Sequence, residues 1–224
     1  TLYGPCTSTP TLMYHHIEPM DVAKASGHAF LTVAPDTFSA QMQFLQDRGY
    51  QPITVEQLIA FFDHGSPLPG KSILLTFDDG YEDFRQYAYP TLQQHHFPAT
   101  IFLPTGLVNN PGYLSWSQIQ EMAASGLINF ANHTWSHRST YGPHQVQLNE
   151  ITTADTQLSE HGLNTNKTFA SPYGSPTSKI TDILTSLNYK LAFLTVPGRT
   201  LCAKQRFSLP RIRIGNANLS NFGL

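Results

Sequence analysis

Short apolar runs alternate with amphipathic stretches along most of the chain. The run at 71–77 is mostly apolar without polar alternation, which is typical of a strand covered on both faces. In the stretch 36–48, Phe38, Met42 and Leu45 recur at helical spacing before Gly49, which favours a helix ending there. By the same criteria we predict strands over 11–17, 53–55, 71–77, 99–103, 127–131, 168–170, 191–196 and 209–214. Helices are predicted over 36–48, 56–62, 82–95, 117–124, 144–161 and 177–187, with Pro90 kinking or splitting the third.

This order of strands and helices indicates an α/β protein with a parallel sheet. Seven or eight strand–helix units in 224 residues favour one domain, residues 1–224, built as a compact (β/α) barrel that is complete or slightly open. A doubly wound open sheet is the alternative. In both architectures the chemistry lies at the carboxyl ends of the strands.

The composition narrows the class of protein. Hydrophobic residues make up 40% of the chain and the net charge is −2, which excludes a disordered protein. No apolar run approaches the length of a membrane span. The 13 Lys and Arg against 15 Asp and Glu argue against a nucleic-acid partner, which calls for a basic surface. Only 12% of the residues are charged, so the polar surface is mainly neutral and suits a hydroxyl-rich ligand.

The two cysteines, Cys6 and Cys202, lie near opposite ends of the chain. Because the termini of a single domain often lie close together, we predict one disulfide between them and an oxidising compartment. Two separate buried thiols are the alternative.

Polar residues gather where the predicted strands end. The strand at 71–77 runs into Asp78, Asp79 and Gly80. Two adjacent carboxylates at a buried strand end are costly unless something neutralises them, and a metal ion would do so. One aspartate would then be a ligand and the other a base. An ordinary Asp-Gly turn is the alternative.

The strand at 127–131 leads to a second polar group, His133 and His137. Two neutral imidazoles with one carboxylate form a site for Zn²⁺ or a similar divalent ion, with positions left open for water. Two surface histidines are the alternative in a chain that has ten.

Two further strand ends carry candidate residues. In the turn after 168–170, Pro172 is followed by Tyr173 and Gly174, and a rigid turn of this kind can aim a backbone N–H at a reacting oxygen. The first predicted strand contains His15 and His16, of which one could be a general acid. The alternatives are an ordinary turn and a structural histidine pair.

Taken together, these motifs resemble the polysaccharide deacetylases of carbohydrate esterase family 4, which share the NodB-homology domain. The resemblance rests on TFDDG at 76–80, HTWSH at 133–137 and the Pro-Tyr-Gly turn at 172–174, and it extends over nearly the whole chain. The YHHI segment at 14–17 and the LPRIRI segment at 209–214 are similar to the branch that deacetylates poly-N-acetylglucosamine in bacterial biofilms.

The resemblance implies a distorted (β/α)₇ barrel of the NodB type and a specific set of roles. Asp79, His133 and His137 match the metal ligands, and Asp78 matches the catalytic base. Tyr173 matches the residue whose backbone N–H stabilises the oxyanion, and His15 matches the catalytic acid.

The family further implies a metal-dependent hydrolase that removes N-acetyl groups from N-acetylglucosamine units of a polysaccharide. The expected ion is Zn²⁺, with Co²⁺ or Ni²⁺ as alternatives. We expect a monomer that is secreted, periplasmic or on the cell surface. The polymer stays open between poly-N-acetylglucosamine, chitin oligomers and peptidoglycan, and the chain can be part of a longer protein.

The sequence departs from the family pattern at two places. Phe169, Ala170 and Ser171 stand where the family has an arginine before Pro-Tyr-Gly, so we expect Arg211 or Arg213 to orient Asp78 instead. The usual Leu-x-His motif near the C-terminus is absent, which favours an N-terminal acid. We prefer His15 over His16 for that role.

Three other functions stay open on the sequence. The same metal fold could act on another linear amide or a cyclic imide, or the chain could be an inactive carbohydrate-binding relative. A glycoside hydrolase is the third, and it fits poorly because Asp78 and Asp79 are adjacent and face different ways, whereas glycosidase carboxylates flank one bond.

Overall fold

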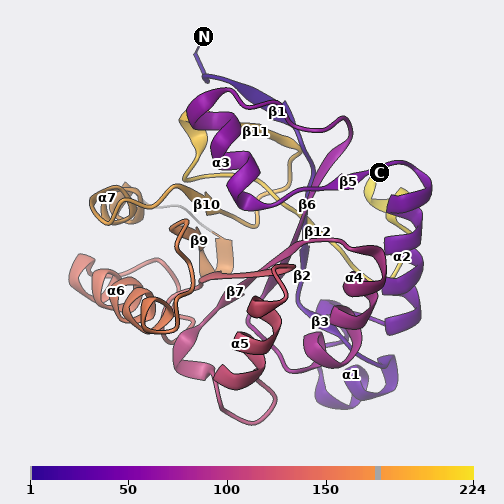
Figure 1. The fold of residues 1–224 in the computed structure, drawn as a ribbon. Helices are drawn as coiled ribbons and strands as arrows, with labels where there is room; N and C mark the ends of the chain where they lie inside the picture. The colour runs from indigo at the N-terminus through magenta and orange to yellow at the C-terminus, as the bar shows by residue number, and fades with distance from the viewer. Residues whose placement is uncertain (1, 175–177) are drawn as a thin grey trace.

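A computed structural model describes residues 2–174 and 178–224. Its centre is a curled, parallel β-sheet surrounded by helices (Figure 1). Along the sheet the strands follow the order β10, β9, β8, β7, β6, β2, β12. Their bounds are β2 Thr11–Tyr14, β6 Ser72–Asp78, β7 Ala99–Leu103, β8 Ile128–Asn132, β9 Thr168–Ala170, β10 Leu191–Phe193 and β12 Ile212–Arg213.

The segment that leads into β12 joins the two edges of the sheet. The N–H of Leu194, next to β10, donates to the carbonyl of Leu209 at 2.9 Å, and the N–H of Ile214 donates to Met13 of β2 at 3.0 Å. Two strands pair with successive parts of β6. β5 (Gln51–Pro52) pairs with its first two residues, and β2 pairs with the residues that follow. The predicted α/β fold with a distorted barrel is confirmed.

Helices cover the outside of the barrel (Figure 1). They are α1 Met20–Ser26, α2 Pro35–Asp47, α3 Val55–His64, α4 Tyr89–His95, α5 Trp116–Ala124, α6 His144–Glu160 and α7 Ser178–Ser186. Short 3₁₀ turns lie at Ala29–Leu31, Thr105–Leu107, Pro172–Gly174, Ala203–Gln205 and Leu219–Phe222. The start of the helix predicted over 177–187 lies outside the described residues at position 177. No described helix combines the length and the apolar character that a membrane crossing needs.

Two predicted strands are wrong. No strand lies over 53–55, because β5 ends at Pro52 and α3 begins at Val55. The strand predicted over 11–17 breaks at His15, after which β3 (His16–Ile17) leaves the barrel and pairs with β4 (Thr32–Val33). The helix predicted over 82–95, with a kink or split at Pro90, is divided into a π-helical turn, Phe84–Ala88, and α4. Pro90 lies at the start of α4, where its missing N–H costs no helical hydrogen bond.

One apolar cluster fills the barrel below its carboxyl end. Five parallel strands contribute to it, β6 to β10, alongside α3 and the segment before β12. Its strand members include Leu74, Phe102, Ala131 and Phe193, and all four side chains are buried. This packed layer supports the polar residues that follow it along each strand.

The predicted disulfide between Cys6 and Cys202 is present. The two cysteines face each other in a small antiparallel sheet formed by β1 (Cys6–Ser8) and β11 (Thr200–Cys202). The bond spans 196 residues and ties the segment before β2 to the segment before β12. These are the neighbouring strands at one edge of the main sheet.

Candidate active site

All six predicted site residues line one pocket at the carboxyl ends of the barrel strands. The pocket holds about 290 Å³. Its walls are His15, Asp78, Asp79, His133, His137 and Tyr173, together with Phe30, Leu31, Thr195 and Arg213. The six predicted residues converge from four separate segments of the chain, as the barrel predicts for functional residues.

Asp79, His133 and His137 form the group that could hold a metal ion. The Nε2 atoms of His137 and His133 lie 3.0 and 3.4 Å from Asp79 Oδ1, and the three ligand atoms lie within 4.8 Å of one another. Asp79 is the first residue after β6 and has a φ of 75°. Gly80 follows it because a Cβ there would lie 2.5 Å from the Leu103 side chain.

The loop after β8 fixes both histidines. His133 Nδ1 lies 2.8 Å from the carbonyl of Ala170, so Nδ1 carries the proton and Nε2 faces Asp79 with a free lone pair. Further along the loop, the backbone N–H and the hydroxyl of Ser136 donate to the Glu150 carboxylate of α6 at 2.8 and 2.7 Å. These bonds hold the residue next to His137.

A divalent ion fits this group on two observations. Asp79 Oδ1 is buried, and no donor in the described ranges reaches it with hydrogen-bond geometry. The His133 atom that faces Asp79 is Nε2, and it is an acceptor because the ring proton is on Nδ1, which donates to the Ala170 carbonyl. One carboxylate oxygen and two imidazole nitrogens form the donor set of a zinc-type site.

Asp78 lies beside this group and is paired with Arg211. The guanidinium donates from Nη1 and Nη2 to the two carboxylate oxygens, each at 2.7 Å. Both side chains are buried, at 0% and 3% exposure. The Arg211 Nε also donates to the carbonyl of Leu194 at 2.8 Å. Burial alone would raise the pKa of Asp78, but Arg211, and after it His133, hold that pKa below its ordinary value.

This pair settles a choice that the sequence left open. Of the two arginines that could replace the missing family arginine, Arg211 contacts Asp78 and Arg213 lines the pocket wall instead. Asp78 is therefore held as an ionised carboxylate in a fixed orientation.

His15 and His16 face opposite sides of their segment. His15 lines the pocket with Asp78 and Asp79. His16 points away, and its Nδ1 lies 2.6 Å from Asp83 Oδ2. Burial lowers the pKa of His15, and the carboxylates of Asp78 and Asp79 only partly oppose that shift.

Tyr173 lies in a strained turn at the pocket mouth. Its φ is 59°, and its ring centroid lies 4.9 Å from that of His137. Gly174 follows with a φ of 78°, and a Cβ there would lie 1.8 Å from the Thr195 hydroxyl oxygen. The turn therefore requires glycine and holds the Tyr173 backbone against the pocket.

Tyr81 is a further neighbour of the site, and its place near a strand end makes it a candidate for stacking on a sugar ring. It lies two residues after Asp79, and its ring packs against that of Tyr113, with centroids 5.3 Å apart. Burial, and next to it the Asp79 carboxylate, raise the pKa of Tyr81, so the hydroxyl stays protonated. A tyrosine directly after Asp-Asp-Gly was the available signal.

Comparison with known proteins places the chain in a family. A family model described as polysaccharide deacetylase matches residues 65–192. The poly-beta-1,6-N-acetyl-D-glucosamine N-deacetylase of Escherichia coli (strain K12) is 26% identical over 92% of this chain, which spans only 36% of that relative. The fold and site define an α/β barrel with a candidate metal site at the carboxyl ends of its strands. More narrowly, the chain belongs to the polysaccharide deacetylase family.

Solved structures agree over nearly the full chain. The Streptococcus pyogenes deacetylase PplD, in complex with acetate, superposes with a TM-score of 0.85 and 31% identity, covering 94% of this chain and 93% of PplD. IcaB from Ammonifex degensii gives a TM-score of 0.82 and 25% identity, covering 96% and 94%.

Proposed function

We propose that this protein is a metal-dependent N-deacetylase that hydrolyses the acetamide groups of a polysaccharide of N-acetylglucosamine. The observation that carries the proposal is the single pocket that joins the Asp79 group, the Asp78–Arg211 pair and His15. Poly-N-acetylglucosamine is the favoured polymer because the Escherichia coli relative is named for it. The disulfide supports a secreted, periplasmic or cell-surface protein.

The role of each residue follows from its position in the pocket. An ion held by Asp79, His133 and His137, with zinc the favoured metal, would polarise the acetamide carbonyl and make water more acidic. Asp78, which Arg211 keeps ionised and oriented, accepts the proton of the attacking water.

The remaining steps use the other two residues. As oxygen adds to the carbonyl carbon, the Tyr173 backbone N–H stabilises the charge that develops on the carbonyl oxygen. His15, on the same pocket wall, donates a proton to the nitrogen as the C–N bond breaks. The products are acetate and a free amino sugar.

The test is acetate release from poly-N-acetylglucosamine, chitin oligomers and peptidoglycan. We expect release from poly-N-acetylglucosamine, loss of release after chelation and recovery when zinc is added back. His137→Ala should lower bound metal and release together, whereas His95→Ala, at the end of α4 and outside the pocket, should change neither. Metal-independent release would contradict the proposal, as would no release from any of the three glycans.

His15 is expected to protonate the leaving amine. His15→Ala should therefore lower turnover on acetamides by about 10²-fold or more. An activated aryl acetate should lose much less, because its leaving group hardly needs a proton. His16→Ala is the matched control and should keep the wild-type ratio of amide to ester turnover, since His16 faces away from the pocket. Equal losses on both substrates for His15→Ala would exclude leaving-group protonation.

The pH profile should report the surroundings of His15. Burial lowers its pKa from an ordinary value of about 6.5, and the charge of Arg213 adds to that lowering. The acid must be protonated, so kcat/KM should fall as the pH rises through this lowered pKa. Arg213→Gln removes a cation and should move the alkaline limb of the pH profile to higher pH. Lys190→Gln is the control and should leave the limb in place, because Lys190 directly precedes β10 and lies outside the pocket. If the alkaline limb of the pH profile does not move in Arg213→Gln, the limb reports a group other than His15.

A further inference from the structure

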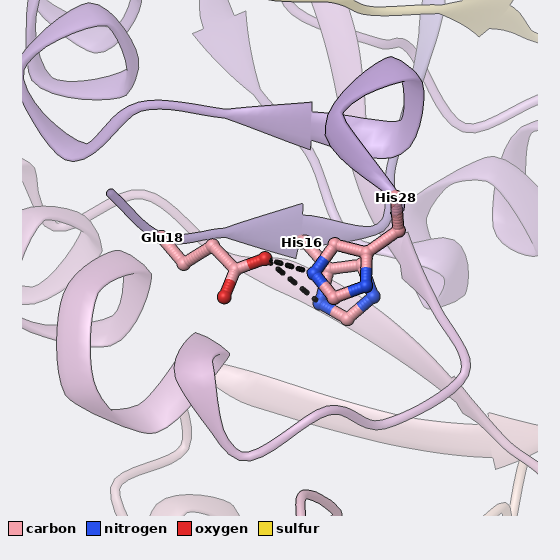
Figure 2. Close-up of side chains that lie close together, drawn as sticks. All are labelled: His16, Glu18 and His28. Carbon is pink, nitrogen blue, oxygen red and sulfur yellow. Dashed lines mark hydrogen bonds and ion pairs between the residues drawn. The ribbon is translucent and has the colours of Figure 1, made fainter. Parts of the chain in front are cut away.

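A second cluster of histidines and carboxylates lies on the far side of the His15 segment. It consists of His16, Glu18, His28 and Asp83, which line a separate cavity of about 280 Å³. Figure 2 shows three of them, with the Glu18 carboxylate facing one nitrogen of each imidazole ring. The cluster shares no residue with the pocket that holds Asp79.

The donor atoms of this cluster converge. His28 Nε2 is in contact with Glu18 Oε1, and His16 Nδ1 lies 3.9 Å from the same oxygen. Asp83 Oδ2 lies 2.6 Å from that His16 nitrogen. One ligand atom from each of His16, Glu18 and His28 lies within 4.8 Å of the others, which is the spacing of ligands around a single ion.

The charge of the cluster calls for a cation. The side chains of Glu18 and Asp83 are 10% and 14% exposed. Within residues 2–174 and 178–224, the ion pairs of these two carboxylates involve imidazoles alone and neither lysine nor arginine. Two largely buried carboxylates are costly without positive charge. Either protons on the two imidazoles or a metal ion must supply it.

We propose that this cluster is a second divalent-metal site. His16, Glu18 and His28 are its ligands, and Asp83 is close enough to the same His16 nitrogen to be a fourth. Two imidazoles and two carboxylates favour Zn²⁺ or a related transition ion over Ca²⁺ or Mg²⁺, which prefer oxygen ligands.

Binding requires one movement. The His16 and His28 rings are stacked, with centroids 4.0 Å apart and planes at 9°. Since the nitrogen lone pairs lie in the ring planes, parallel rings do not point at one ion. His16 is held by Asp83 and by stacking on Tyr81 at 3.6 Å. His28 has a side chain that is 27% exposed, so it is the ring that tilts.

An ion here would tie three segments together. His16 belongs to β3, His28 directly precedes the Ala29–Leu31 turn, and Asp83 follows β6. Asp83 already accepts the Ile17 backbone N–H at 3.0 Å. The site would therefore fasten the strand that begins directly after His15 to the loop that begins with Asp79.

The test counts metal ions per chain after equilibrium dialysis of the full protein against Zn²⁺. We expect two ions in wild type. A Glu18→Gln/His28→Ala variant should hold one, and so should Asp79→Asn/His137→Ala, because each removes a different site. The combination of all four substitutions should hold none. His95→Ala should still hold two.

Thermal unfolding supplies a second readout. Zn²⁺ should raise the melting temperature of Asp79→Asn/His137→Ala and leave that of the fourfold variant unchanged. If the double substitution at Glu18 and His28 prevents folding, His28→Gln alone tests the site, because that side chain is partly exposed. It should weaken binding of the second ion at least tenfold. A wild-type count of one ion, lost in Asp79→Asn/His137→Ala, would overturn the proposal and leave the cluster with protons only.

Discussion

Replacing Arg211 with glutamine should lower the free energy of unfolding by about 3–5 kcal/mol, the usual effect of removing one partner from a buried ion pair. Asp78 would keep its burial and lose both 2.7 Å hydrogen bonds from the guanidinium. Its pKa would rise, because Arg211 is the largest of the influences that hold it low. Turnover should fall with stability, since a protonated Asp78 cannot accept a proton from water. Chemical denaturation and acetate release measure the two effects.

The pH dependence of this loss has a definite sign. The folded pKa of Asp78 lies below its unfolded value, so the pair contributes fully above pH 4 and loses its contribution as the pH falls through the lower, folded pKa. The difference between wild type and Arg211→Gln should therefore be largest near neutral pH and shrink in acid. The double variant Asp78→Asn/Arg211→Gln should be less destabilised than the sum of the single variants. Additive effects would mean that the two side chains are not coupled.

Asp78→Asn should reduce turnover by about 10²–10⁴-fold, the range for losing a general base. The amide keeps the shape of the carboxylate and can still accept one bond from Arg211, but it cannot accept a proton. Metal content should stay at the wild-type value, because the proposed ligands are Asp79, His133 and His137. Elemental analysis and acetate release on the same sample separate the two roles.

Asp47→Asn, at the end of α2, is the matched control for Asp78→Asn and should behave as wild type. Loss of metal in Asp78→Asn would make this residue a ligand. Unchanged turnover would remove it from the mechanism.

The site residues that directly follow a strand along the chain could be predicted from the sequence. The apolar run at 71–77 corresponds to β6, Ser72–Asp78, and its end fixes the place of both aspartates. The run at 127–131 does the same for His133 through β8, Ile128–Asn132. In a parallel barrel these ends meet, so the sequence was sufficient to predict that the three candidate ligands, Asp79, His133 and His137, lie together.

What the sequence could not predict depends on contacts between distant segments. Arg211 and Arg213 are two residues apart and equivalent by pattern, and only the closure of the barrel shows which one reaches Asp78. The break at His15 arises because β3 pairs with β4 instead of continuing along β6. His28 lies in a stretch for which no element was predicted, so its meeting with His16 across two loops had no signal in the local pattern.

The two ends of the chain, joined by the Cys6–Cys202 bond, carry His15 and Arg211, whereas all three ligands of the Asp79 group lie within residues 65–192. On the proposed mechanism, the metal ligands and the base Asp78 therefore come from the central stretch, whereas the acid and the arginine that orients the base come from the terminal segments. Substitutions in the terminal strands can retune the acid and the base while the metal ligands stay untouched. In this barrel, the surroundings of the acid and the base can therefore change separately from the metal ligands.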